Sequence, residues 1–385
     1  WPRAGRFVVR TFSWLAITLF NMQVPFNDVK RSLLKNEKSK KEAISRVFGA
    51  GVFFFGEETR AFQSELAVYL GADHVIPVAN GTDALEIALL SVGVRRGDTV
   101  VTVANAGGYS TAAILKCGAS PAYVDISAED LQVDVSNLHK VLEACEKLPA
   151  AVVVTHLYGF MAPVKKILEI CKAYSIPIVE DCAQSIGVRE HGVHVGNFGD
   201  IATLSFYPTK NLGGAGDSGA VFTSSAEYAE RAKRLSQYGW GEKYHAELTG
   251  GRNSRMDEVQ AALLRIDLRE LEDRNARRRA VFDFICTRAA HLRFPHRGAS
   301  AFNAHLAIVS TAGRDELRKH LSSHGIETAI HYPVPDHRQT AWRSMDVSLP
   351  VTETESESIL SIPAFPELEV NELDHIVETL GGWRL

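Results

Sequence analysis

A lysine follows an apolar run near the middle of the chain. Residues 205–214 read SFYPTKNLGG, so Lys210 comes after a predicted buried strand and before a glycine-rich turn. A lone lysine is most often a solvated surface residue, but burial at such a strand end would lower its pKa. An amine that has lost its proton can attack a carbonyl carbon, which is the requirement for covalent lysine catalysis.

Two acidic residues follow another apolar run. Glu180 and Asp181 come directly after IPIV at 176–179. A carboxylate held at a buried strand end is costly unless it meets a cation or hydrogen-bond donors. A protonated heterocyclic nitrogen would satisfy this requirement, and a structural arginine would satisfy it equally well.

A third motif, NGTD at 80–83, leads directly into a predicted helix. The amides of Gly81 and Thr82, with the threonine hydroxyl, could cradle a phosphate at the positive end of that helix. The alternative is an ordinary N-cap, because Asn, Thr and Asp all cap helices well. A phosphate cradle, a buried carboxylate and an activated lysine together indicate a site for pyridoxal phosphate.

Other motifs of this kind have simpler explanations. Gly214, Gly216 and Gly219 have GxGxxG spacing, but a strand (AVFTSS) follows them, whereas a dinucleotide fingerprint opens a helix. His191 and His194 form an HxxH without the carboxylate of a metal-binding helix, and we expect them to be structural or solvated. No metal site is predicted.

The elements that must position these residues alternate from about residue 74. Apolar strands are predicted within 74–79, 98–104, 121–126, 150–159, 176–183, 201–208 and 219–225, with amphipathic helices at 82–93, 110–118 and 164–174. This order predicts an α/β fold with a mostly parallel central sheet flanked by helices. The three motifs all lie just after strands, where ligands bind in such sheets.

The chain is expected to have two domains. GGRN at 250–253 is followed by a long helical pattern at 254–285, so we predict a large domain over 22–250 and a smaller α+β domain over 251–385. The arginines at 274–279 lie among acidic residues at helical spacing and are expected to form a solvated, ion-paired face. Residues 7–20 are apolar, but Arg10 interrupts them and leaves the run far short of the about 20 residues of a membrane span. We take residues 1–21 to be extraneous to the fold.

Composition favours small-molecule chemistry. The 385 residues carry a formal net charge of −4 with no long basic block, which argues against binding to nucleic acid or to an anionic membrane. The five cysteines are odd in number and lack CxxC spacing. They predict a reducing, cytoplasmic location.

The chain resembles the DegT-type sugar aminotransferases, which are fold-type I pyridoxal phosphate enzymes that aminate nucleotide-linked ketosugars. The resemblance runs from Met22 through nearly the whole chain. It includes VANGTDAL, HLYG, VEDCAQSIG, SFYPTKNLGG, GGRNSRMDEVQAALL and IHYPVPDHRQTAW. It implies the fold expected above, with pyridoxal 5'-phosphate as the cofactor.

The resemblance also implies roles for individual residues. Lys210 would bond the cofactor covalently and then act as the base, while Asp181 would pair with the protonated pyridine nitrogen. The other residues that match cofactor-binding positions are Gln184 beside the ring hydroxyl, Tyr109 stacked on the ring, Gly81, Thr82 and Ser205 at the phosphate, and Asn253 donated to that phosphate by a second subunit. A homodimer with shared active sites is therefore implied.

His156, Tyr158, His331 and Tyr332 lie in motifs that border the sugar site in this family, although Tyr332 could equally be a packing residue. The resemblance implies glutamate as the amino donor and a thymidine-diphosphate-linked 3-keto-6-deoxyhexose as the acceptor. A 4-keto sugar nucleotide is the alternative within the same chemistry. A catalytically idle regulator that binds a sugar nucleotide is a further alternative, against which Lys210, Asp181 and Gln184 argue.

Overall fold

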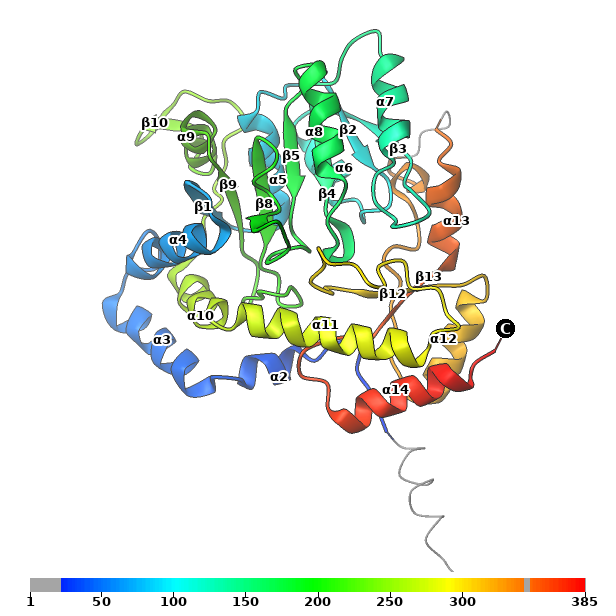
Figure 1. Ribbon diagram of the computed structural model, residues 1–385. Helices are drawn as coiled ribbons and strands as arrows, with labels where there is room; N and C mark the ends of the chain where they lie inside the picture. The colour runs from blue at the N-terminus through cyan, green and yellow to red at the C-terminus, as the bar shows by residue number, and fades with distance from the viewer. Residues whose placement is uncertain (1–21, 343–346, 385) are drawn as a thin grey trace, which may run out of the picture.

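The computed structural model describes residues 22–342 and 347–384, so the predicted extraneous segment 1–21 lies outside the described residues. A seven-stranded sheet has the order β1-β9-β8-β5-β4-β2-β3 (Figure 1). Strand β9 pairs antiparallel with β1 and β8, and the other neighbours pair in parallel. This confirms the mostly parallel sheet. The strands are β1 (His74–Val78), β2 (Thr99–Val103), β3 (Ser120–Val124), β4 (Ala151–Thr155), β5 (Ile178–Asp181), β8 (Ile201–Ser205) and β9 (Gly219–Thr223).

Helices cover both faces of this sheet, which explains why its strands are almost uniformly apolar. Side chains alternate across a strand, and in β4 Val152 and Val154 pack on one face while Val153 packs on the other. The first face is covered by α4 (Glu57–Leu70), α7 (Val135–Glu143), α8 (Val164–Ala173) and α10 (Glu258–Leu268). The second is covered by α5 (Gly81–Ser91), α6 (Tyr109–Lys116) and α9 (Ala226–Leu235).

The single helical pattern predicted over 254–285 forms two helices. α10 ends at Leu268, and α11 (Leu271–Arg288) begins after a break at Arg269 and Glu270. The two helices have different partners, because α10 packs against α3 (Glu37–Ala50) and α4, whereas Phe282 and Ile285 of α11 belong to a second core. No glycine or proline marks the break in the sequence.

The second core is built mainly from residues after 280, together with Val24 from the start of the described chain. Val24 bridges Ile326, and β12 (Ala307–Ser310) pairs antiparallel with β13 (Ile359–Ile362). The division into domains at residue 250 stays a prediction. The remaining helices are α2 (Val29–Leu34), α12 (Arg314–Ser323), α13 (Pro350–Ser358) and α14 (Val370–Gly382).

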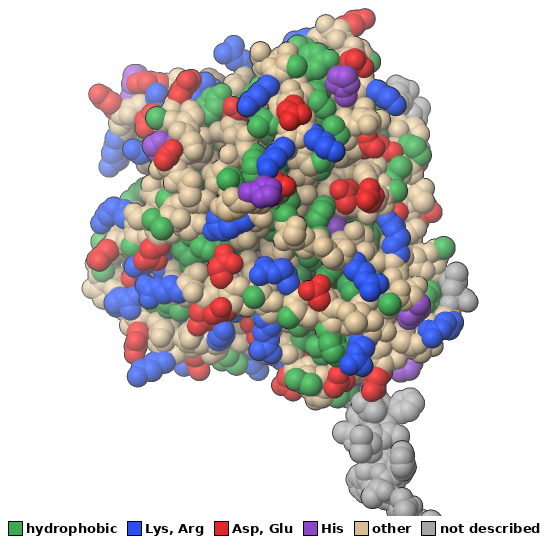
Figure 2. All heavy atoms as spheres, viewed as in Figure 1, with side chains coloured by type: hydrophobic (Ala, Val, Ile, Leu, Met, Phe, Trp, Pro, Cys, Tyr) green, Lys and Arg blue, Asp and Glu red, His purple; other side chains and the backbone are tan. Residues whose placement is uncertain are grey.

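Short elements complete the described part of the chain. On the face shown in Figure 2, acidic and basic side chains are interspersed. Among residues 22–342 and 347–384, every helix falls short of the length and apolar character that a bilayer crossing demands. The short elements are β6 (Arg189–Glu190), β7 (Val193–His194), β10 (Trp240–Glu242), β11 (His245–Ala246) and the 3₁₀ turns η1 (Leu157–Gly159) and η2 (Asp336–Arg338).

Candidate active site

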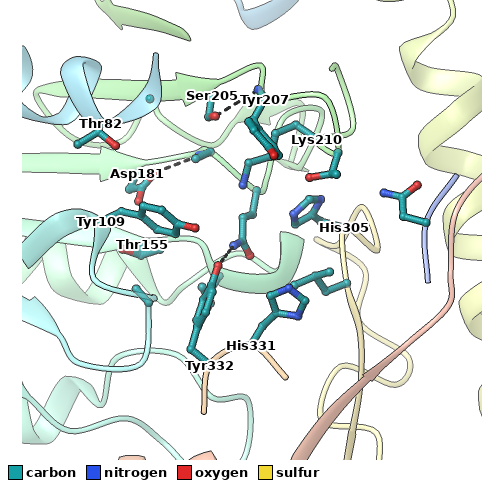
Figure 3. Close-up of a pocket in the computed structure, with 18 of the residues that line it drawn as sticks. Thr82, Tyr109, Thr155, Asp181, Ser205, Tyr207, Lys210, His305, His331 and Tyr332 are labelled. Atoms are coloured by element: carbon teal, nitrogen blue, oxygen red, sulfur yellow. Dashed lines mark hydrogen bonds between the residues drawn. The ribbon is translucent and has the colours of Figure 1, made fainter. Parts of the chain in front are cut away.

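A cavity of about 550 Å³ opens at the carboxyl ends of β1, β4, β5 and β8 (Figure 3). This is the edge at which ligands bind in open α/β sheets, and the motifs singled out in the sequence meet there. The cavity is lined by Gly81 and Thr82 after β1, by Thr155, Asp181 and Ser205 as the last residues of β4, β5 and β8, and by Tyr109, Gln184, Lys210, His331 and Tyr332.

Lys210 projects into this cavity from the turn after β8, where its backbone amide donates to the carbonyl of Tyr207 at 2.8 Å. In Figure 3 its side chain lies between Tyr207 and His305. Burial lowers the pKa of the amine to about 8, and the charge of Asp181 offsets part of that effect. Lys210 is therefore a lysine that is readily deprotonated, in contrast to the solvated alternative.

Asp181 ends β5 inside the same cavity with 5% of its surface exposed. Its Oδ1 accepts a hydrogen bond from the Ala183 amide at 3.0 Å. Burial raises the pKa of the carboxyl, and the Ala183 amide and the charge of Lys210 offset only part of the rise. Within the described residues no arginine pairs with Asp181, so the chain itself does not provide the structural-arginine alternative.

The start of α5 lies against Ser205. Asn80 caps the helix in the ordinary way, since its Oδ1 accepts from the Asp83 amide at 2.8 Å. The first-turn amides of Gly81 and Thr82 have no partner in the helix. A Cβ at Gly81 would lie 2.7 Å from the Cβ of Ser205, so glycine is required for this close approach. Asn80 can therefore cap the helix while the amides of Gly81 and Thr82 are available to a phosphate, so the two interpretations of the NGTD motif are compatible.

The opposite wall of the cavity carries aromatic rings and an amide. Tyr109 is the first residue of α6, is 49% exposed, and meets Tyr332 edge to face at 6.1 Å between ring centroids. Gln184 accepts from the Tyr158 amide at 2.7 Å and donates to the Tyr332 hydroxyl at 3.2 Å. Thr155 Oγ1 is buried without a partner among the described residues. A planar ring with a phosphate tail fits these groups.

Two of the residues predicted for the sugar site, His156 and Tyr158, lie beneath the cavity and do not line it. His156 Nδ1 accepts from the Ala162 amide at 3.1 Å, so Nε2 carries the proton that it donates to Glu180 at 2.8 Å. The Tyr158 hydroxyl donates to the carbonyl of His331 at 2.8 Å. Tyr158 therefore supports a residue that lines the cavity, whereas the ring of His156 contacts Ala162 and Glu180, which do not line it.

Glu180 is the first acidic residue of the EDC motif and is fully buried. Burial raises its pKa, but the hydrogen bond from His156 and the amides of Gly199 and Gly196 outweigh this effect and hold the pKa below its ordinary value. Glu180 therefore anchors the loop after β7 through the amides of Gly196 and Gly199. It also accepts the hydrogen bond from Nε2 of His156. Asp181 is the carboxylate left to face the cavity.

The sequence of the whole chain agrees with this geometry. The model of the DegT/DnrJ/EryC1/StrS aminotransferase family matches residues 35–381. The chain belongs to this family. It is therefore an aminotransferase, and its cofactor is pyridoxal phosphate, as a solved relative from Bacillus subtilis with bound cofactor PMP illustrates at 28% identity and a TM-score of 0.87.

Relatives of this aminotransferase match over nearly their whole length. The erythromycin biosynthesis sensory transduction protein EryC1 of Saccharopolyspora erythraea is 36% identical over 366 residues, which cover 93% of this chain and 99% of the relative. The dTDP-3-amino-3,4,6-trideoxy-alpha-D-glucose transaminase of Streptomyces venezuelae is 36% identical over 368 residues, with coverages of 94% and 96%. The crystal structure of S. venezuelae DesV with a ketimine intermediate superposes with a TM-score of 0.90 at 36% identity, covering 94% of this chain and 98% of DesV.

Two arginines of the 274–279 cluster are buried, and one of them, Arg278, lines the aminotransferase cavity. The arginines at 274–279 were expected on a solvated face, and this is wrong for Arg274 and Arg278, which are 7% and 4% exposed. Glu367 pairs with Arg274 at 3.0 Å, and the carbonyl of Ala364 accepts from Arg278 at 3.0 Å, so the segment after β13 covers this side of α11.

Helical spacing could have revealed this burial. Arg274 and Arg278 lie four residues apart, and Val281, Phe282 and Ile285 continue the same buried stripe of α11. Other lining residues carry no local signal, because distant segments bring them to the cavity. These are Phe26, Asn27, Asp217 and His305.

The remaining sequence predictions concern residues outside the cavity. Asn253 is exposed and does not line the cavity of its own chain. His194 is buried and accepts from the Gly187 amide at 2.8 Å, whereas His191 is exposed, in line with the structural or solvated roles expected for the HxxH. The glycines of GAGDSG lead into β9 and not into a helix, as predicted.

Proposed function

We propose that this aminotransferase moves an amino group from glutamate to a nucleotide-linked keto-deoxysugar in deoxyaminosugar biosynthesis. The observation that carries the proposal is Lys210, a lysine of lowered pKa that shares a cavity with the buried Asp181. We further propose a dTDP-linked 3-keto-6-deoxyhexose as the acceptor. Support comes from the S. venezuelae relative and from the dTDP-3-amino-3,6-dideoxy-alpha-D-galactopyranose transaminase of Aneurinibacillus thermoaerophilus, which is 35% identical.

Residues of this chain would hold the cofactor at both ends. The amides of Gly81 and Thr82 and the hydroxyl of Ser205 would bind the phosphate at the start of α5. Asp181 would pair with the protonated pyridine nitrogen, which would satisfy a carboxylate that forms no ion pair within the described residues. Tyr109 would cover the ring, and Gln184 would bind its hydroxyl. When bound, pyridoxal phosphate supplies the electron sink for transamination.

Lys210 would do the proton chemistry. With its pKa lowered to about 8, Nζ is free of a proton in about a tenth of molecules at pH 7, so the amine can hold the cofactor covalently. Once released, Nζ is placed to take a proton from the substrate carbon and to return it. His331 and Tyr332 line the space left for the sugar, and Tyr158 positions His331 through its hydrogen bond to the His331 carbonyl.

We also propose a homodimer with shared active sites, located in the cytoplasm. Asn253 lies outside its own cavity, as a residue that serves a second subunit would. An exposed apolar loop lies beside it, since the carbonyl of Phe53 accepts from the Glu258 amide at 3.0 Å and Arg255 covers the ring of Phe54 at 4.8 Å. Phe53, Phe54 and Phe55 are each 44–48% exposed, which suits contact with a second copy.

The test is an acceptor panel. Enzyme, glutamate and a set of 3-keto and 4-keto dTDP-sugars are incubated together, and the masses of the products are read. We expect amination of the 3-keto sugars and no product with Lys210→Ala, whose fold is checked by circular dichroism. Amination of 4-keto sugars alone would replace the proposed acceptor by the alternative. A lack of product from any ketosugar, with no borohydride-reducible bond at Lys210, would favour an idle regulator.

A further inference from the structure

The cavity has a basic end away from the predicted cofactor groups. In Figure 3, Asp181, Thr82 and Ser205 lie on one side of Lys210, and His305 lies on the other. Arg278, from the middle of α11, lines the cavity together with His305 and His331. None of these three residues has been given a part in holding the cofactor.

Arg278 is a buried cation with incomplete pairing. It exposes 4% of its surface, its Nη1 donates to the carbonyl of Ala364 at 3.0 Å, and its Nε has no partner among the described residues. The nearby carboxylate of Glu367 pairs with Arg274 at 3.0 Å. Burial and the charge of Arg274 lower the pKa of Arg278 to about 10, although Glu367 acts in the opposite direction.

The histidines beside Arg278 do not add a second cation. Burial, followed by the charges of Lys210 and Arg278, holds the pKa of His305 well below its ordinary value. Its Nδ1 donates to Asn211 Oδ1 at 2.9 Å, because the Asn211 amide nitrogen already donates to Asn275. Burial and Lys210 also lower the pKa of His331 to about 4. Arg278 is therefore the fixed positive charge at this end.

Burying a charged group costs free energy unless a ligand or a counterion pairs with it. The guanidinium is planar and suits a carboxylate, with which it can form parallel hydrogen bonds. The amino donor of the proposed reaction brings carboxylates to Lys210 in every catalytic cycle. A carboxylate is also small enough for a position enclosed by Ile362, Ala364 and Phe365, which line the same cavity.

We propose that Arg278 binds a carboxylate of the amino donor and so selects an amino acid for the first half-reaction. This inference rests on the proposed function and deepens it. The nucleotide diphosphate of the acceptor is the competing anion, but the enclosure of Arg278 favours the smaller group. Arg278 therefore belongs to the donor subsite, and the acceptor's nucleotide is held elsewhere.

The two half-reactions separate donor binding from acceptor binding. In the first, the loss of cofactor absorbance is followed as glutamate is added without ketosugar. In the second, enzyme already loaded with the amino group is mixed with the ketosugar. For Arg278→Met we expect the concentration of glutamate needed for half-maximal rate to rise on the order of 100-fold, while the second half-reaction changes less than about threefold. Arg278→Lys should lose less.

Arg277→Met is the matched control. Arg277 lies beside Arg278 on α11 and likewise donates to a carbonyl, that of Leu368 at 3.2 Å, but it does not line the cavity. It should leave both half-reactions near the wild-type values. Calorimetry with glutarate, which has two carboxylates and no amine, gives a readout apart from turnover, and its affinity for the holoenzyme should fall in parallel with that of glutamate.

Comparison of amino donors identifies the carboxylate. If Arg278 binds the α-carboxylate, Arg278→Met weakens alanine and glutamate alike, and if it binds the side-chain carboxylate, glutamate is weakened far more. Either result supports the proposal. Equal losses in both half-reactions, a loss only with ketosugar, or unchanged glutamate and glutarate affinities would overturn it. If Arg278→Met does not fold, Arg278→Lys decides by the same criteria, and absence of cofactor bonded to Lys210 in the wild type would instead refute the proposed function.

Discussion

Lys210 and Asp181 influence each other in opposite directions. Burial alone would push the lysine toward its neutral form and the aspartate toward its protonated form, and the attraction between the two charges opposes both shifts. The result is an amine with a pKa of about 8 that can be deprotonated without leaving the cavity. The position of a single side chain therefore sets the pH range in which the enzyme captures its cofactor.

We predict that cofactor capture by the apoenzyme depends on this pKa. Because the folded-state pKa lies below the ordinary 10.5, the amine is protonated and unreactive below about pH 8 and neutral above it. The initial rate of pyridoxal phosphate uptake, followed by absorbance, should fall by about tenfold per pH unit below that value and level off above it. Asp181→Asn removes the charge that raises the pKa, so its midpoint should move lower. A midpoint near 10.5 would contradict the burial of Lys210.

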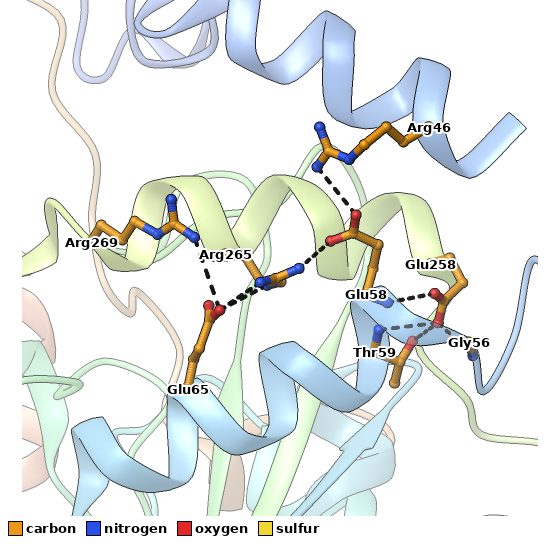
Figure 4. Close-up of polar contacts among 8 residues, drawn as sticks. All are labelled: Arg46, Gly56, Glu58, Thr59, Glu65, Glu258, Arg265 and Arg269. Atoms are coloured by element: carbon orange, nitrogen blue, oxygen red, sulfur yellow. Dashed lines mark hydrogen bonds and ion pairs between the residues drawn. The ribbon is translucent and has the colours of Figure 1, made fainter. Parts of the chain in front are cut away.

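At the scale of elements, the contact between α4 and α10 includes one buried carboxylate, that of Glu258 (Figure 4). Glu258, in the first turn of α10, accepts from the amides of Gly56, Glu58 and Thr59 at 2.8–3.1 Å and from the Thr59 hydroxyl. It therefore caps α4 from another helix. It also fixes the start of α10, which follows the segment that carries Asn253.

Glu258→Ala should lower the free energy of unfolding by about 2–3 kcal/mol, because three amides at the start of α4 lose their acceptor in a buried position. Urea unfolding followed by circular dichroism measures the change. Arg265→Met is the control, since its ion pairs with Glu58 and Glu65 are partly exposed and should contribute less than about 1 kcal/mol. Equal losses for the two variants would show that Glu258 is no more than another member of the ion-pair network.

The elements differ in how much the sequence could reveal about them. Strands and helices of the central sheet are predictable because each is a local apolar run bounded by turn residues, and the motifs at their ends are adjacent in sequence. The break between α10 and α11 and the burial of Arg278 were not predicted. Both arise from packing partners that lie far away in the sequence, Lys40 for Asp267 of α10 and Ala364 for Arg278 of α11.

At the scale of the whole molecule, shared active sites make a prediction that a monomer cannot satisfy. In a shared site, Lys210→Ala removes a group that one subunit supplies, and Asn253→Ala removes a group that the other subunit supplies. When the two variants are unfolded together and refolded, mixed dimers contain one intact site, so activity should return to about a quarter of the wild-type value. The recovery is measured by comparing the sugar aminotransferase activity of the refolded mixture with that of each variant refolded alone.

The control mixture pairs Lys210→Ala with Asp181→Asn. Both residues line the cavity of one chain, so every site in a mixed dimer keeps a defect and activity should not recover. Recovery in the control, or none in the first mixture, would contradict a site shared through Asn253.

The start of the described chain has a practical consequence for protein engineering. Val24 is bridged to Ile326, the ring of Phe26 stacks on His331 at 5.7 Å, and Asn27 lines the cavity. Phe26 and Asn27 form part of the wall around the reacting groups, and the bridge at Val24 holds the segment that carries them. Trimming the chain past Met22, or anchoring the enzyme to a support through this segment, would therefore alter the catalytic chamber itself, even though the change is made at the periphery of the sequence.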